Sequence, residues 1–201
     1  MGGPLRRRCA KAWTQLMRYD RQILAYHGCD VQTAQRLLDG EPFLPSENDY
    51  DWLGRGVYFW EYGPDRAYRF AMEQRARGKL NKPAVVGAIV QLGKCFDLLD
   101  TRFTSDLVAA AGRWEAMAIA AGIALPRNAG PAPDLKLRRR DCAFLNWYLD
   151  DVAAKTTYDT VRGAFVEGDR IHEGSGIFRE THIQVAVRSS SCILGVFRPQ
   201  G

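Results

Sequence analysis

Residues 84–92 are apolar at nearly every position, and many of them are β-branched. A short apolar run of this kind is typical of a buried strand rather than of an amphipathic helix. Residues 94–98 follow across Gly93 and are expected to pair with this strand through a turn at the glycine. The chain is therefore expected to build its core around a sheet.

Other segments alternate in polarity or repeat with helical spacing. The predicted strands are residues 22–26, 57–60, 181–187 and 192–197. The predicted helices are residues 6–19, 31–38 after an N-cap at Asp30, 64–78 with Pro64 in the first turn, 104–121 and 141–152. Residues 41–50, 127–133 and 163–175 are predicted as loops. Because strands and helices do not alternate steadily, the prediction is a single α+β domain over residues 1–201, with residues 1–20 as an N-terminal helical segment.

Composition narrows the classes of protein. The chain has 201 residues and a formal net charge of +5, which suits a polyanionic ligand but requires none. The five cysteines are widely spaced and the three histidines are few, so neither a disulfide framework nor a metal site is expected. Apolar runs too short to span a bilayer and the lack of a signal sequence predict a cytoplasmic protein without a membrane partner.

The first candidate stretch is Tyr26-His27-Gly28, at the end of a predicted strand. An imidazole there could bind a ribose hydroxyl, and a glycine lets a ligand approach the backbone. The alternative is a structural histidine beside a turn glycine. Cys29 follows directly and is a conceivable thiol nucleophile, although no accompanying base is evident.

The second candidate stretch, residues 52–61, places several aromatic rings beside two glycines and ends at Glu61. Strand alternation puts Tyr58 and Trp60 on one face and Phe59 on the other. One face can then enter the core while the other presents a ring for stacking. The alternative is a well-packed strand, because Tyr and Trp fill cores routinely.

The third candidate stretch is residues 180–187. Alternation places Glu180, His182, Gln184 and Ala186 on one face of a strand whose other face is apolar. A solvated edge strand would show the same pattern. Neither a glycine-rich dinucleotide motif after a strand nor a phosphate-binding loop motif occurs, which argues against Rossmann and NTPase classes.

In this order, the three stretches resemble the ADP-ribosyltransferase superfamily, in its diphtheria-toxin and PARP-like branch, whose signature is His, Tyr, then an acid or amide. They also look like a group of small, mostly uncharacterised bacterial proteins. The resemblance implies two small, mostly antiparallel sheets that grip NAD in a cleft, with helices packed outside. It implies NAD as a substrate and no metal.

The resemblance also implies roles for individual residues. His27 would bind a ribose hydroxyl, the Gly28 backbone would hold the nicotinamide carboxamide, and Tyr58 would stack on the nicotinamide ring. Contacts to the ligand or acceptor are expected from Ser46, Asn48, Asp51, Gly56, Arg179 and His182.

The third position departs from the usual acid, because the residue in the matching phase is Gln184. A glutamine can hydrogen-bond a ribose but offers no full negative charge. Glu180, on the same face, and Glu61, after the tyrosine strand, are the rival carboxylates.

The expected activity is cleavage of the nicotinamide–ribose bond and transfer of ADP-ribose to a macromolecular acceptor, protein or nucleic acid. A toxin or a defence factor would fit this activity. The alternatives are an NAD glycohydrolase and a non-catalytic module that binds NAD, ADP-ribose or RNA ends. RNA 2′-phosphotransferases are similar in structure, but they need an arginine and histidine constellation that this sequence does not display.

Overall fold

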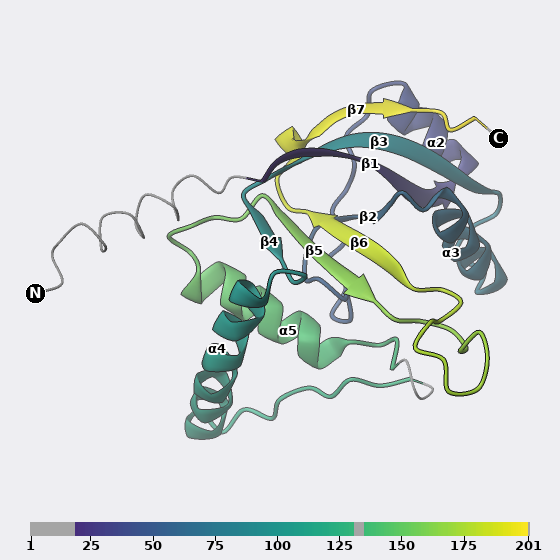
Figure 1. Cartoon of the computed structure of the whole chain (residues 1–201). Coiled ribbons are helices and arrows are strands. Elements are labelled where there is room, and N and C mark those ends of the chain that lie inside the picture. The colour runs from purple at the N-terminus through teal and green to yellow at the C-terminus, as the bar shows by residue number, and fades with distance from the viewer. Residues whose placement is uncertain (1–18, 131–134, 201) are drawn as a thin grey trace, which may run out of the picture.

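The computed structural model describes residues 19–130 and 135–200. The predicted helix at residues 6–19 lies outside this part of the chain, apart from Tyr19, where the first strand begins. The described residues form a mixed α+β structure, as predicted (Figure 1).

One seven-stranded sheet organises the structure, in the order β4-β5-β6-β2-β1-β3-β7. The strands are β1 (Tyr19–Asp30), β2 (Val57–Glu61), β3 (Pro83–Gly93), β4 (Cys95–Asp97), β5 (Thr160–Phe165), β6 (His182–Val187) and β7 (Ile193–Phe197). Neighbouring strands are antiparallel except β4 and β5, which are parallel. The prediction of two separate sheets is therefore wrong.

The junction between β1 and β2 is nevertheless narrow. These two strands are paired only at Ala25–Glu61 and Tyr26–Trp60, whereas β1 and β3 are paired from Tyr19–Gly93 to Asp30–Pro83. Figure 1 shows β1, β3 and β7 together above β2, β6 and β5, which run at an angle to them. The sheet is therefore continuous at these two residue pairs, and β1 and β2 separate beyond Tyr26 and Trp60.

The helices cover the sheet from several sides. They are α2 (Val31–Leu38), α3 (Pro64–Ala76), α4 (Thr101–Ala120) and α5 (Arg139–Trp147), and α5 continues into a π-helical turn at Tyr148–Val152. The Asp30 side chain accepts a hydrogen bond from the Gln32 backbone N–H and so caps α2, and Pro64 opens α3, as expected. A 3₁₀ turn at Ser190–Cys192 joins β6 to β7.

Two predictions about the sheet were wrong. Residues 95–97 pair with β5 rather than folding back onto β3. Lys94 and Asp159 hold the starts of β4 and β5 together, because the Lys94 N–H donates to Asp159 Oδ2 and the Asp159 N–H donates to the Lys94 carbonyl. Residues 163–165 belong to β5 and not to an exposed loop. Gly163 inside this strand gave the sequence the character of a turn.

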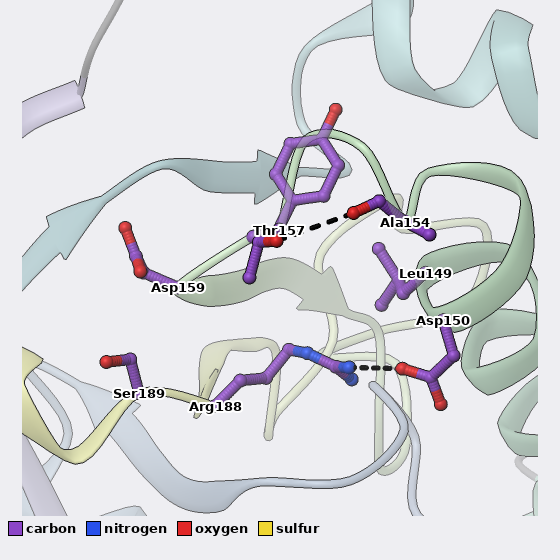
Figure 2. A pocket seen from close by; sticks show the side chains of 8 residues that line it. Leu149, Asp150, Ala154, Thr157, Asp159, Arg188 and Ser189 are labelled. Carbon is purple, nitrogen blue, oxygen red and sulfur yellow. Dashed lines mark hydrogen bonds and ion pairs between the residues drawn. The ribbon is translucent and has the colours of Figure 1, made fainter.

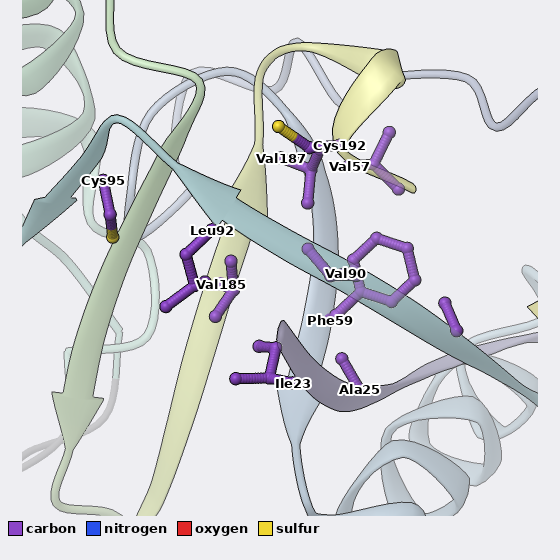
Figure 3. Packing of buried hydrophobic residues seen from close by; sticks show 11 residues of the cluster. Ile23, Ala25, Val57, Phe59, Val90, Leu92, Cys95, Val185, Val187 and Cys192 are labelled. Atoms are coloured by element: carbon purple, nitrogen blue, oxygen red, sulfur yellow. The ribbon is translucent and has the colours of Figure 1, made fainter. Parts of the chain in front are cut away.

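Alternate residues of the strands enter two different cores. Val185 and Val187 of β6 lie in one cluster, whereas Ala186 lies in the other, which confirms the predicted phase of this strand. Figure 3 shows the first cluster, with Phe59 of β2 facing Val90 of β3. The second cluster joins β5 and β6 to α4 and α5. Both faces of the sheet are thus covered near β6.

Helix α3 lies directly on β1 at Gly28. A Cβ atom at this position would come within 2.2 Å of the Ala67 carbonyl oxygen. Gly28 is therefore required by the close approach of the helix backbone, a reason that the sequence interpretation did not include. The face of β1 under α3 is closed, and only the strand edge is left for a ligand.

Gly28→Ala is expected to destabilise the protein by about 1–3 kcal/mol, because the new methyl group overpacks this contact. Urea unfolding measures the change. The matched control is Gly112→Ala in α4, where a Cβ would meet nothing within 4 Å and where alanine should stabilise the helix by about 0.5–1 kcal/mol. Equal effects of the two substitutions would contradict the close approach.

Candidate functional site

A cavity of about 950 Å³ opens where β1 and β2 separate. Eight of the predicted site residues line it: His27, Gly28, Ser46, Asn48, Asp51, Gly56, Tyr58 and Gln184. The structure thus brings residues from all three candidate stretches to a single cavity. Glu61, Glu180 and His182 are not among the lining residues.

The His27 side chain bridges β1 and β2 at the point where the two strands separate. Its Nδ1 lies 2.8 Å from the Tyr58 carbonyl oxygen. Because a carbonyl only accepts, Nδ1 carries the proton and Nε2 keeps a lone pair. Burial lowers the pKa of His27, despite the opposing effect of that hydrogen bond, so the ring is neutral at pH 7. The rings of Phe43 and Phe59 flank the imidazole at 5.5 and 5.7 Å.

The β1–β2 register explains what this hydrogen bond replaces. The Leu24 carbonyl accepts from the Tyr62 N–H, so even-numbered residues of β1 direct their backbone polar groups toward β2. Continued past Tyr26–Trp60, the same register would place Gly28 opposite Tyr58. The imidazole of His27 takes the Tyr58 carbonyl instead, which leaves the Gly28 N–H and C=O directed into the gap.

Tyr58 is anchored by its hydroxyl group. The hydroxyl donates to the Gly54 carbonyl at 2.6 Å and accepts from the Leu53 N–H at 2.8 Å. Burial raises the pKa of Tyr58 well above its usual value, so the phenol stays neutral. Both hydrogen bonds wrap the loop before β2 around the ring and fix the ring at the cavity wall.

The loop at residues 46–51 adds a polar wall. Asn48 Nδ2 donates to Ser46 Oγ at 2.8 Å and to Asp51 Oδ1 at 3.4 Å. Asp51 Oδ2 is buried and has no hydrogen-bond partner among the described residues. Burial raises the pKa of Asp51. This oxygen therefore keeps an unused acceptor position, although protein atoms enclose it.

Gln184 reaches the cavity from β6, opposite Trp60 in the register. Its Nε2 lies 3.1 Å from Nε2 of His182, whose side chain is only 7% exposed. His182 thus stands behind the cavity wall in contact with a lining residue, not at the position expected for a direct ligand contact.

Glu61 does not supply a charge to the cavity. It is buried in an ion network with Arg162, at 2.6 Å, and Arg21, at 2.5 Å. Arg162 also pairs with Asp97 at 3.0 Å. The network ties β2, β4 and β5 together at the closed end of the β1–β2 junction, so Glu61 has a structural role here.

Glu180 also lies away from the cavity, where it faces Arg69 at 3.7 Å. Arg179 donates its backbone N–H to the Asp169 carbonyl and is not a lining residue either. Neither position supports the contact that the sequence led us to expect.

Glu167 lines the cavity and was missed by sequence reasoning, because it falls in the segment predicted to be an exposed loop. Its side chain is 2% exposed and pairs with Arg66 at 2.7 Å and with Lys136. Burial alone would raise the pKa of Glu167, but the hydrogen bonds from Lys136 and Arg66 outweigh it and the pKa is lowered. The sequence around Glu167 carries no motif that would have singled it out.

Other chemistry finds less support. Burial raises the pKa of the Cys29 thiol to about 11, which disfavours a thiolate nucleophile. No group of three or more His, Cys, Asp or Glu side chains suited to a metal ion occurs within residues 19–130 and 135–200. Among the helices of that same part of the chain, none has the length and apolar character needed to cross a membrane.

A second, smaller cavity of about 380 Å³ lies between the end of β6 and the π-helical turn. Figure 2 shows Arg188 reaching Asp150 across it, at 2.6 Å. Arg55 pairs with the same carboxylate. Arg188 is thus paired with Asp150, and none of the predicted site residues lines this cavity.

Comparisons with known proteins add one short match. Over 46 residues, which is 23% of this chain, the sequence is 44% identical to the uncharacterized protein MJ0359 of Methanocaldococcus jannaschii, and the match spans 21% of that protein. No protein-family model and no solved structure matches the chain. The geometry of the cavity is therefore the basis for any functional proposal.

Arg162→Met is expected to destabilise the protein by about 3–5 kcal/mol, because it leaves the buried Asp97 without its cation and Glu61 with only the half-exposed Arg21. Urea unfolding measures the change. The control is Arg36→Met, whose partner Glu41 and own side chain are both more than half exposed, and whose effect should stay within about 0.5 kcal/mol. A similarly small effect at Arg162 would show that the network is dispensable.

The free energy of unfolding should fall as the pH is lowered from about 7.5 to 5.5. In this range the histidines of the unfolded chain bind protons, whereas the buried histidines of the folded protein stay largely unprotonated. Burial lowers the pKa of both His27 and His182 below 6.5. Their contribution is therefore complete above the unfolded pKa and is lost as the pH falls toward the folded one. Urea midpoints across this range measure the slope.

His27→Gln should flatten this slope, and His172→Gln, at an exposed position, should leave it unchanged. An unchanged slope in His27→Gln would mean that His27 binds protons equally in the folded and unfolded states, which would contradict a lowered pKa.

Proposed function

We propose that the protein cleaves the nicotinamide–ribose bond of NAD and transfers ADP-ribose to a macromolecular acceptor. The observation that carries the proposal is the convergence of His27, Tyr58 and Gln184 on the cavity at the point where β1 and β2 separate. The three residues also stand in the order of the signature that the sequence resembles.

The nicotinamide end fits the edge of β1. A carboxamide has one donor group and one acceptor, and the Gly28 C=O and N–H directed into the gap complement both. The ring of Tyr58, fixed by its hydroxyl group, offers a flat surface for the pyridinium ring. His27 Nε2, the free acceptor, suits a ribose hydroxyl.

The remainder of the cavity fits a dinucleotide. Arg77 and Lys79 lie among its lining residues and supply cations for a diphosphate, whereas Lys136, which also lines the cavity, is paired with Glu167. Trp52, Trp60 and Phe70 add aromatic surface for a base or a ribose. A cavity lined by aromatic side chains and a few cationic ones is typical of sites that bind dinucleotides.

In the proposed reaction, the C–N bond to nicotinamide breaks and its electron pair leaves with the pyridine ring, which becomes neutral. The ribose carbon then carries positive charge, which the oxygen of an acceptor attacks while its proton passes to solvent. The residues act mainly by positioning the ligand and by directing negative dipole ends at the developing charge. With water as the acceptor, the same steps give an NAD glycohydrolase.

The amide at position 184 favours a second candidate, a module that binds NAD or ADP-ribose without turnover. A glutamine directs a dipole rather than a full charge at the ribose, so binding and catalysis must be measured separately.

Incubation with NAD should release nicotinamide, and His27→Ala should reduce the rate about 100-fold, because the ribose loses its positioning contact. Gln184→Leu, which preserves volume, should also reduce it. His172→Ala, at an exposed position outside the cavity, is the matched control. Chromatography of the products measures nicotinamide, and circular dichroism verifies folding.

Label transfer from NAD to protein or nucleic acid identifies the acceptor, and free ADP-ribose alone selects the glycohydrolase. Tight NAD binding by calorimetry with no product selects the binding module. Release that is equal in the parent and in both cavity variants would refute the enzyme proposal.

A further inference from the structure

His182 is enclosed behind the cavity wall, although no step of the proposed reaction uses it. Its ring lies 6.3 Å from that of Trp52, 6.5 Å from that of Trp60 and 6.0 Å from that of Phe165. A histidine this enclosed needs partners for both ring nitrogens, and the two partners differ in kind.

Nδ1 of His182 lies 2.6 Å from the Glu180 carbonyl oxygen. This carbonyl only accepts, so Nδ1 carries a proton and, in the neutral ring, Nε2 is an acceptor. The atom that faces Nε2 at 3.1 Å is the amide nitrogen of Gln184. The hydrogen bond therefore runs from Gln184 to His182, and the arrangement satisfies both groups in one way only.

We propose that His182 is a positioning residue that fixes the Gln184 amide with its nitrogen toward the imidazole and its carbonyl oxygen toward the cavity. This inference rests on the proposed function for its consequence in catalysis. A fixed oxygen accepts a ribose hydroxyl and directs the negative end of the amide dipole at the developing charge. Gln184 then presents the same kind of atom as the acid that usually occupies this position.

Burial and the groups around the ring together favour the neutral form of His182. Burial lowers the pKa of His182, and Arg66 of α3 acts in the same direction. Glu167, whose Oε2 lies 3.8 Å from Nδ1, and Glu180 oppose it. Protonation would place a hydrogen on Nε2, where it would face the amide nitrogen, so the amide would have to turn its oxygen away from the cavity.

The inference predicts a specific tautomer that can be observed without any activity. In protein labelled with nitrogen-15 in histidine, His182 should show a protonated Nδ1 and an unprotonated Nε2 at neutral pH. The chain has three histidines, and His182→Phe assigns the signals by removing one set. A protonated Nε2 at neutral pH would overturn the inference.

The catalytic consequence is tested by a double-mutant cycle. His182→Phe retains an aromatic ring among its neighbours but removes the acceptor, so nicotinamide release should fall about tenfold as the amide loses its fixed orientation. In the Gln184→Glu background, either carboxylate oxygen can face the cavity. The same substitution should therefore cost no more than about twofold there. Equal losses in both backgrounds would show that His182 serves only the packing.

The two measurements separate this inference from the proposed function. If His182 shows the expected tautomer but the protein does not cleave NAD, the positioning role of His182 stands and the proposed enzyme activity is refuted. If the protein cleaves NAD but Nε2 of His182 is protonated, the enzyme activity stands and the positioning role is refuted.

Discussion

The hydrogen bond from His27 Nδ1 to the Tyr58 carbonyl determines where the sheet opens. A backbone N–H from Gly28 would occupy that carbonyl if the β1–β2 ladder continued in its register. By substituting for it, one side chain ends the ladder and leaves two backbone groups of Gly28 directed at the cavity. Sheet edges of this kind are recognition surfaces, because they pair with any group of matching donors and acceptors.

The opening needs a firmly closed end beside it, and the buried ion network provides one. Glu61 stands at the last β1–β2 pair, opposite Ala25, and Arg162 links it to Asp97. Charges buried in this manner are costly unless each is paired, so the network specifies one arrangement of the strands. The carboxylate that ends the aromatic strand thus supports the shape of the cavity rather than its chemistry.

Local patterns were sufficient for part of this structure. Alternation gave the phase of β6 and placed Gln184 opposite the apolar face, and the capping pattern gave the start of α2 at Asp30. Contacts between distant segments were beyond such patterns. Arg162 and Glu61 are 101 residues apart, and Glu167 depends on Arg66 and Lys136 from two other segments. Nothing next to these residues in the sequence indicates their burial.

The electrostatics of the cavity bear on the amide at position 184. Glu167 is paired with two cations, so its field within the cavity is largely cancelled. Asp51 keeps an oxygen without a partner among the described residues, and Gln184 adds an amide dipole. Under the proposed function, the developing positive charge would meet one carboxylate and one oriented dipole instead of a single glutamate. Such a division works only if the amide cannot rotate, which makes the group behind Gln184 as consequential as Gln184 itself.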